Sequence, residues 1–316
     1  MAFDIVTCGS ATVDVFAHTQ VNPIGKKLIG YPSGGKILIN SLQQELGGGG
    51  TNTAVAFSRL GLKTGYIGCV GNDIQGKQIQ NSLANEKVSF LGQTSSEQTG
   101  YSVILDAIAH DRTILTYKGA NDRLNKVRLP KTRWFYFSSM IGQSLKTQGA
   151  LADYARKHGI FIAFNPSMYQ VTKGIGAIRK ILSATHILIF NKEEAKALTK
   201  KKKVPQMHKR LHDLGIPISV ITDGSSQVSC YDGDGYYIAQ PQKVKVVEST
   251  GAGDAFAAAF VWSYQMTSDI AVSLAAGIVN SQSVLGYIGA KKGLCTKQQL
   301  VKLLKSSGVA VKKASF

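Results

Sequence analysis

Residues 186–199, HILIFNKEEAKALT, pass from a short apolar run directly into a helix-like segment that begins with two acidic residues. The same rhythm recurs on both sides of this stretch. Further apolar runs occupy residues 134–139 (WFYFSS), 160–165 (IFIAFN) and 217–222 (PISVIT), and helix-like segments occupy residues 145–159 and 176–184. Strands that alternate with helices predict a parallel sheet covered by helices on both faces. We therefore expect an α/β fold with three layers, α/β/α.

Two strand-rich segments, at about residues 20–45 and 98–120, interrupt this rhythm. Their apolar pieces are bounded by Gly and Pro, and the second segment is predicted to form two strands joined near His110 and Asp111. We expect the segments to pair as a small β-sheet on an otherwise single domain of residues 1–316. Ligands of open α/β sheets bind at the carboxyl ends of the strands, so this small sheet would act as a lid.

The composition favours a cytoplasmic protein. No run of 18 or more apolar residues occurs, and residues 1–10 lack the charged and apolar regions of a signal peptide. Four cysteines, at positions 8, 69, 230 and 295, form no CxxC pair. We therefore expect no membrane span, no disulfide scaffold and no zinc site.

The formal charge of +18 would suit an anionic partner. The densest basic run, Lys200–Lys203, lies beside Pro205 in a predicted loop. The chain lacks the spacings of zinc fingers and basic leucine zippers, and it lacks the alternating aromatic and basic residues of an RNA-binding sheet. We therefore do not expect nucleic acid as the partner, and attraction of anionic small molecules needs no further assumption.

A glycine turn precedes a predicted helix in residues 246–260, VVESTGAGDAFAAAF. The unpaired backbone N–H groups of Gly251, Ala252 and Gly253 would form a cradle for a phosphate group. Asp254 would repel a phosphate that was merely bound there, but it could orient an attacking hydroxyl and accept its proton. An alternative is that Asp254 only stabilises the first helical turn, and this stretch alone does not decide between the two.

Two further segments carry candidate ligands. GGGGTNTA, residues 47–54, places four glycines before a predicted helix with Asn52 on its first turn, where the amide could bind a hydroxyl. NKEE, residues 191–194, places Asn191 and Glu194 on one helix face after a strand, which suits a hydrated Mg²⁺. The alternatives are a flexible loop and an ordinary acidic helix start.

Other phosphate and hydrolase motifs are incomplete. GNDIQGKQ, residues 71–78, resembles a Walker A loop but has Gln78 where a hydroxyl should bind Mg²⁺. No GxGxxG follows the first strand, and neither HExxH nor GxSxG is present.

Together these segments resemble the ribokinase-like carbohydrate kinase family, also called PfkB, over nearly the whole chain. The chain resembles the first family signature at GGGGTNTAVAFSRLG followed by VGNDIQG, and it resembles the second at STGAGDAFAAAF. NKEE resembles the family's NxxE motif, ITDGSS its nucleotide loop, and RTILTYKGAND its lid strands. The order and spacing of all five agree with the family.

The resemblance implies transfer of the γ-phosphoryl group of ATP, with Mg²⁺, to an alcohol. It implies Asp254 as the base. The anion hole would comprise Gly251, Ala252 and Gly253. The ligands of the acceptor's hydroxyls would be Asp14, Gly48, Gly49 and Asn52. Asn191 would serve the phosphate region and Glu194 would bind Mg²⁺ through water. Thr222, Gly224, Ser225 and Asn280 would border the nucleotide.

The chain departs from the family pattern at four positions. Glu248 stands where the family usually has Asp at a position that often helps to bind a monovalent cation, so activation by K⁺ is left open. Gln227 replaces a second glycine of the nucleotide loop, Gly50 replaces a lysine of many ribokinases, and Asn165 replaces an aspartate.

Three functions remain open at this point. The first is a kinase for a small sugar, with ribose leading, and the second is a kinase for adenosine, inosine, guanosine or cytidine. A nucleoside needs an apolar or aromatic slot, for which the candidates near the lid are Phe16, Tyr31, Tyr101 and Tyr117. The third is a non-catalytic protein that binds phosphate or nucleic acid, against which the retained Asp254 argues. An exposed edge of the lid also offers a homodimer contact.

Overall fold

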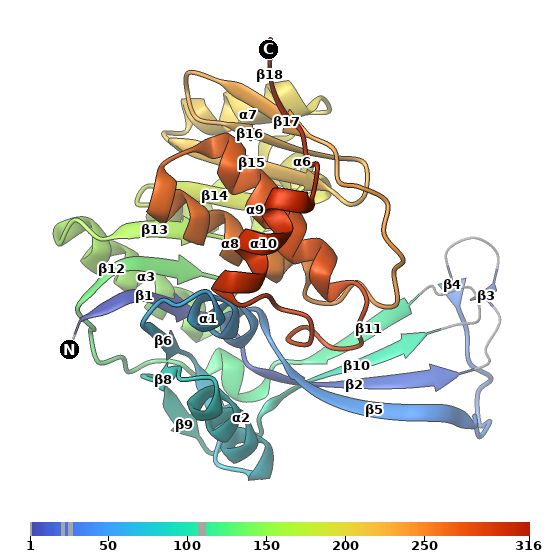
Figure 1. Ribbon diagram of the computed structural model, residues 1–316. Coiled ribbons are helices and arrows are strands. Elements are labelled where there is room, and N and C mark those ends of the chain that lie inside the picture. Colours follow the sequence, from blue (N-terminus) through green and yellow to red (C-terminus); the bar gives the residue numbers. More distant parts are fainter. Residues whose placement is uncertain (1, 20–22, 25–27, 107–111) are drawn as a thin grey trace.

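The computed structural model describes residues 2–19, 23–24, 28–106 and 112–316, and Figure 1 shows its main sheet crossing the body of the molecule. Among these residues the main sheet has ten strands. In spatial order they are β18 (Val311–Ala314), β17 (Tyr236–Ala239), β16 (Gln227–Tyr231), β15 (Ile218–Asp223), β14 (Ile187–Asn191), β13 (Phe161–Phe164), β12 (Thr132–Phe137), β1 (Phe3–Cys8), β6 (Thr64–Ile67) and β8 (Ser89–Phe90). The run from β15 to β8 is parallel, and β16, β17 and β18 are antiparallel additions.

Helices cover both faces of this sheet, as the strand–helix rhythm predicts. One face packs against α1 (Gly49–Arg59), α2 (Ile74–Asn85), α8 (Ala252–Thr267), α9 (Ile270–Val284) and α10 (Lys297–Ser306). The other face packs against α3 (Gly142–Lys157), α4 (Met168–Val171), α5 (Ile175–Leu182), α6 (Lys192–Thr199) and α7 (Val204–Asp213). Neighbouring strand residues alternate between the two cores, so Tyr136 belongs to the first and Phe137 to the second. The three-layer α/β/α prediction is confirmed.

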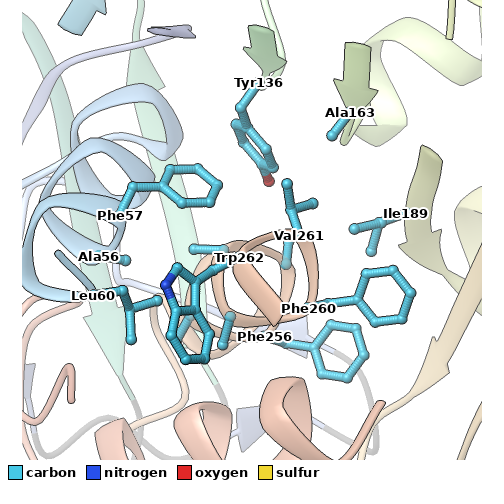
Figure 2. Close-up of a cluster of buried hydrophobic side chains, with 14 of the residues drawn as sticks. Ala56, Phe57, Leu60, Tyr136, Ala163, Ile189, Phe256, Phe260, Val261 and Trp262 are labelled. Atoms are coloured by element: carbon cyan, nitrogen blue, oxygen red, sulfur yellow. The ribbon is translucent and has the colours of Figure 1, made fainter. Parts of the chain in front are cut away.

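Helix α8 lies at the centre of the first core. Figure 2 shows its residues Phe256 and Phe260 near Ile189 of the sheet, while Trp262 faces Leu60 of α1. An unbroken run from Ala255 to Ser263 is buried. A helix that is apolar on every side is stable only when other elements enclose it, which fixes the position of its N-terminus. No helix among the described residues has both the length and the apolar character needed to cross a bilayer.

A separate four-stranded sheet projects from the main body (Figure 1). Its order is β11 (Arg112–Tyr117), β10 (Gly100–Asp106), β2 (Thr12–Thr19) and β5 (Ile39–Gly47). Smaller elements are the pair β3 (Pro23–Ile24) and β4 (Leu28–Ile29), the pair β7 (Cys69–Gly71) and β9 (Gln93–Ser95), and a 3-10 turn at Gly119–Asp122.

The small sheet differs in one respect from the sequence prediction. Strand β2 lies before the segment expected at about residue 20, because TVDVFAHT pairs with β5 along its whole length and with β10 from Thr12 to His18. Asp14 therefore belongs to a strand of the small sheet. Residues 20–22, 25–27 and 107–111, which include the predicted join at His110 and Asp111, lie outside the described residues.

Candidate active site

A polar cavity of about 320 Å³ opens where several parallel strands reach their carboxyl ends, the usual ligand-binding edge of such sheets. Ser138 and Ser139 follow β12, Asn191 ends β14 and Thr222 lies near the end of β15. The remaining wall includes Ser10, Gly49, Asn165, Pro166, Ser167, Glu194, Gly251, Gly253, Asp254 and Phe256. Segments that are far apart in the sequence therefore meet at one polar cavity.

Asp254 lies in the first turn of α8 and lines this cavity. The Asn52 Nδ2 group donates a hydrogen bond of 2.9 Å to Asp254 Oδ2. Burial raises the pKa of the Asp254 carboxyl above its ordinary value. The hydrogen bond from Asn52 opposes this pKa shift, the charge of Asp14 adds to it and the charge of Lys291 opposes it. Asp254 is thus a desolvated and more basic carboxylate, as a proton acceptor requires.

The turn before Asp254 contains two glycines with different physical roles. Gly251, the N-cap of α8, has φ of 83°, and a Cβ added there would lie 2.4 Å from the Ala290 Cβ. Packing and backbone conformation therefore both exclude a side chain at Gly251. Gly253 is exposed, and a Cβ added there would meet no atom within 4 Å. The space beside Gly253 is open, which suits a ligand that approaches the backbone N–H groups of the turn.

The glycine loop 47–50 brings α1 against the same site. Gly48 is the N-cap of α1 with φ of 95°, and a Cβ there would lie 2.5 Å from the Ser10 carbonyl oxygen. A Cβ on Gly49 would lie 3.3 Å from Asp254 Oδ1. Gly49 lines the cavity, whereas Gly48 packs against the backbone of Ser10 and Ala11.

Asp14 lies beside this loop but does not line the cavity. Its Oδ1 accepts a hydrogen bond of 2.9 Å from Thr12 Oγ1, and a Cβ on Gly47 would lie 1.9 Å from its Oδ2. Burial raises the pKa of Asp14, while hydrogen bonds from Thr12 and Ser102 and the charge of Lys291 lower it. A second desolvated carboxylate thus acts electrostatically on Asp254.

Three buried polar atoms near Asp254 have no hydrogen-bond partner among the described residues: Asn52 Oδ1, Ser138 Oγ and Tyr136 OH. Orphaned buried polar groups are costly and call for a water or a ligand. Sequence reasoning missed Ser138. The sequence feature that could have identified Ser138 is its position directly after the strand WFYF, since this strand ends at the same sheet edge as Asn191.

Asn191 and Glu194 form a capping box at the start of α6. Asn191 Oδ1 accepts from the Glu194 N–H at 2.9 Å, and Glu194 Oε2 accepts from the Asn191 N–H at 3.0 Å. Both residues also line the cavity, and burial raises the pKa of Glu194. The described residues contain no cluster of three or more His, Cys, Asp or Glu side chains. One carboxylate beside a phosphate cradle fits Mg²⁺, which takes few protein ligands and completes its shell with water and phosphate oxygens.

A second cavity of about 570 Å³ adjoins the first and shares Thr222, Gly253 and Phe256 with it. Its wall includes the predicted nucleotide residues Thr222, Gly224 and Ser225, together with Ala252. The apolar residues of the same wall include Val244, Val246, Ile278 and Leu285. This cavity has the apolar character that a heterocyclic base requires.

Two predicted residues have internal partners instead of facing these cavities. Asn280 Nδ2 donates to the Ala255 carbonyl oxygen at 2.8 Å, and its Oδ1 accepts from the Cys295 N–H at 3.0 Å, so the amide joins α9 to α8. Ile278 and Ser281, and not Asn280, line the nucleotide-type cavity. Glu248 Oε1 accepts from the N–H groups of Ser249 and Thr250, which closes the turn before α8.

A desolvated carboxylate thus follows a glycine turn at a polar cavity, with an apolar cavity adjoining it, and this arrangement on an α/β fold is suited to phosphoryl transfer. The chain belongs to the pfkB family of carbohydrate kinases, whose model matches residues 5–297.

Among named relatives, the chain is similar to a ribokinase of Haemophilus influenzae, with 27% identity over 82% of this chain and 87% of that protein. It is also similar to an uncharacterized sugar kinase of Archaeoglobus fulgidus, with 29% identity over 76% of this chain and 98% of that protein. Among solved structures, a Methanocaldococcus jannaschii nucleoside kinase has a TM-score of 0.80 at 21% identity and covers 96% of this chain and 98% of its own. An Arabidopsis thaliana ribokinase complexed with ribose and ATP has a TM-score of 0.80 at 21% identity, and the match covers 96% of this chain and 99% of that one. The latter two likenesses establish the fold alone.

Proposed function

We propose that this kinase transfers the γ-phosphoryl group of ATP to a hydroxyl of a small, ribose-like sugar, with Asp254 as the general base. One observation carries the proposal: Asp254 lines the polar cavity, and its neighbour Gly253 lines both that cavity and the apolar one. A nucleotide in the apolar cavity would therefore present its terminal phosphate to an acceptor beside Asp254. The names of the ribokinase relatives support this assignment.

Each wall of the site has a role in this reaction. The apolar side chains Val246 and Ile278 would contact the adenine, and the N–H groups of the 251–253 turn would stabilise charge on the transferred group. Asp254 would take the proton of the attacking hydroxyl as the new P–O bond forms. Mg²⁺, when bound, neutralises phosphate charge, and Glu194 would hold it through water.

A small sugar is favoured over a nucleoside by the orientation of the lid tyrosines. Asp14 pairs in register with Ser102, whereas Tyr101 pairs with Val13 and with Tyr117. Because successive strand residues point to opposite faces, both tyrosines lie on the face opposite to Asp14. The observation that favours a nucleoside is Ile114, which shares the Asp14 face and is 46% exposed.

The small sheet is proposed as a lid and as the contact between two copies of the chain. Its outer strands β5 and β11 have unpaired edges among the described residues. Exposed apolar side chains lie on both of them, namely Ile39, Leu42, Ile114, Leu115 and Tyr117. Light scattering at assay concentration tests this proposal, and a monomeric mass would contradict it.

The experiment that tests the function is a screen of ATP consumption with Mg²⁺ over pentoses, hexoses and nucleosides. We expect a pentose to give the highest kcat/KM, with product absent in an Asp254→Asn control. Higher kcat/KM for a nucleoside would establish the second candidate. No ATP consumption with any acceptor would refute kinase activity on these classes.

A further inference from the structure

Residues 241–247 lie between β17 and α8 and form one side of the apolar cavity. The members of this segment in the cavity wall are Pro241, Gln242, Lys243, Val244 and Val246. The segment contains no helix or strand. The other side of the cavity is firm, because Phe256 and Ile278 are buried in the first core. A ligand in this cavity would therefore lie between packed core side chains and a loop.

Both ends of this segment are hydrogen-bonded to one turn of α9. At one end, Gln282 Nε2 donates to the Gln242 carbonyl oxygen at 2.7 Å. At the other end, the Val247 and Glu248 N–H groups donate to the Leu285 carbonyl oxygen at 2.7 Å and 3.3 Å. Positions 282 and 285 lie about one helical turn apart, on the same side of the helix. The segment therefore forms a strap that is tied to the helix at two points.

Between these two ties, the strap makes no hydrogen bond with any residue that the structure describes. Val244 and Val246 are 41% and 56% exposed although they line the cavity, so a ligand that covers them gains hydrophobic free energy. Residues 235–247 include two lysines, Lys243 and Lys245, and no Asp or Glu. Exposed valines beside cations suit a nucleoside polyphosphate, whose base has apolar faces and whose tail is anionic.

The side chain of Gln242 has a different partner from its backbone. Its Nε2 group donates to the Ser307 carbonyl oxygen, just after α10. The Gln282 amide therefore holds the backbone of the strap, whereas the Gln242 amide holds the end of α10. Because the first tie needs only the carbonyl group of Gln242, substitution at each position removes one tie and keeps the other.

We propose that residues 241–247 are a nucleotide-binding strap, and that Gln282 is the positioning residue that holds this strap against the base through the Gln242 carbonyl oxygen. The inference rests on the proposed function in taking the apolar cavity as the nucleotide site. Its consequence for nucleotide affinity does not depend on which acceptor is phosphorylated.

The binding test compares two methionine variants of similar side-chain length, Gln282→Met and Gln242→Met. Gln282→Met removes the donor that holds the strap, so we expect Kd and KM for ATP to rise about three- to tenfold, as for the loss of one neutral hydrogen bond. The kcat and the KM for the sugar should not change, because the acceptor lies at the polar cavity. Gln242→Met keeps the carbonyl acceptor, so its Kd for ATP should stay within about twofold of wild type.

Calorimetric titration with ATP in the absence of an acceptor gives Kd without turnover, and melting temperature verifies that both variants are folded. An unchanged Kd in Gln282→Met, an equal rise in both variants, or a fall in kcat alone would overturn the inference. A raised Kd only in Gln282→Met, in a protein that phosphorylates no acceptor, would support the strap and refute the proposed function.

Limited digestion with trypsin tests the strap itself, because Lys243 and Lys245 are exposed cleavage sites within it. Gln282 also belongs to the cavity wall, so this experiment separates a loosened strap from a lost contact with the nucleotide. Without nucleotide, cleavage at the two lysines should be about threefold or more faster in Gln282→Met than in wild type. ATP should slow this cleavage in wild type.

The internal control of the digestion is the exposed run Lys200–Lys203, where mass spectrometry should find equal cleavage in wild type and Gln282→Met. Strap cleavage at the same rate in wild type and Gln282→Met, or strap cleavage that ATP does not slow, would contradict the inference.

Discussion

Asn52 Nδ2 lies 2.9 Å from Asp254 Oδ2, and this hydrogen bond joins the first turn of α1 to the first turn of α8 across 202 positions of sequence. The second polar atom of the amide, Asn52 Oδ1, is buried and has no hydrogen-bond partner in the part of the chain that the structure describes. Asn52 therefore orients the proposed base with one atom and leaves the other for a hydroxyl or a water.

Replacing Asn52 by Ala should lower kcat by about tenfold to a hundredfold, because a hydrogen bond to a charged group contributes about 1.5–3 kcal/mol. The Asn52 donor lowers the pKa of Asp254, so its loss should also move the acid limb of the pH profile upward. Steady-state rates from pH 5 to pH 8 measure both effects. The control is Thr53→Ala, which removes hydrogen bonds to the carbonyl oxygens of Gly49 and Gly50 in the same helix and leaves Asp254 untouched. If the rates of wild type and Asn52→Ala fall at the same acidic pH, this role of Asn52 is contradicted.

Replacing Glu194 by Gln should raise the Mg²⁺ concentration for half-maximal turnover by about tenfold, the lower end of effects seen for outer ligands of metals. Gln can still accept the hydrogen bond from the Asn191 N–H, so the capping box and the melting temperature should survive. Magnesium titration of turnover checks this, with Glu193→Gln as the control. Glu193 lies in the same helical turn, but its side chain is 70% exposed and does not line the cavity. If turnover depends equally on Mg²⁺ in Glu194→Gln and Glu193→Gln, the assignment of Glu194 to the metal site is wrong.

Replacement of Gly251 and of Gly253 by alanine should have different effects on the stability of the fold. Gly251→Ala should destabilise the fold by about 1–3 kcal/mol, because the residue has φ of 83° and its Cβ would collide with Ala290. Gly253→Ala should leave the melting temperature unchanged or slightly raised, since its Cβ meets no atom. The same methyl group should lower turnover by about tenfold or more if phosphate approaches this backbone. Full activity in a stable Gly253→Ala protein would contradict the cradle.

Activation by K⁺ remains a prediction that depends on Glu248. Its carboxylate keeps the charge that a cation requires, although Oε1 already accepts from Ser249 and Thr250. We expect modestly higher turnover in KCl than in NaCl or CsCl, and loss of the difference in Glu248→Gln. Equal rates in the three salts would mean that this chain has no such site.

The sequence predicted most of the central sheet because its strands are short, apolar and separated by helical periods. It did not predict β2, since Asp14 and His18 interrupt the apolar pattern of TVDVFAHT and only long-range pairing with β10 and β5 makes it a strand. The final strand β18 was missed for the same reason, as two of its four residues are lysines.

The structure places several motif residues of the predicted site at one cavity and holds others in contacts that depend on packing, and the roles of all of them remain predictions. Asp254, Gly253 and Glu194 line one cavity as their motifs indicate. Asn280 is instead held by backbone groups of Ala255 and Cys295, contacts that no spacing in the sequence encodes.

The most direct test of the central claim is Asp254→Asn, with turnover, ATP affinity and melting temperature measured on the same purified protein. Asn cannot accept the proton of the attacking hydroxyl, so kcat should fall by about 10²–10⁴-fold. ATP affinity should be retained or increased because a negative charge beside the phosphates is removed, and the melting temperature should change little. Near wild-type turnover by a folded Asp254→Asn protein would contradict the mechanism. A loss of activity that merely follows a lowered melting temperature would show instead that Asp254 only stabilises the helix terminus.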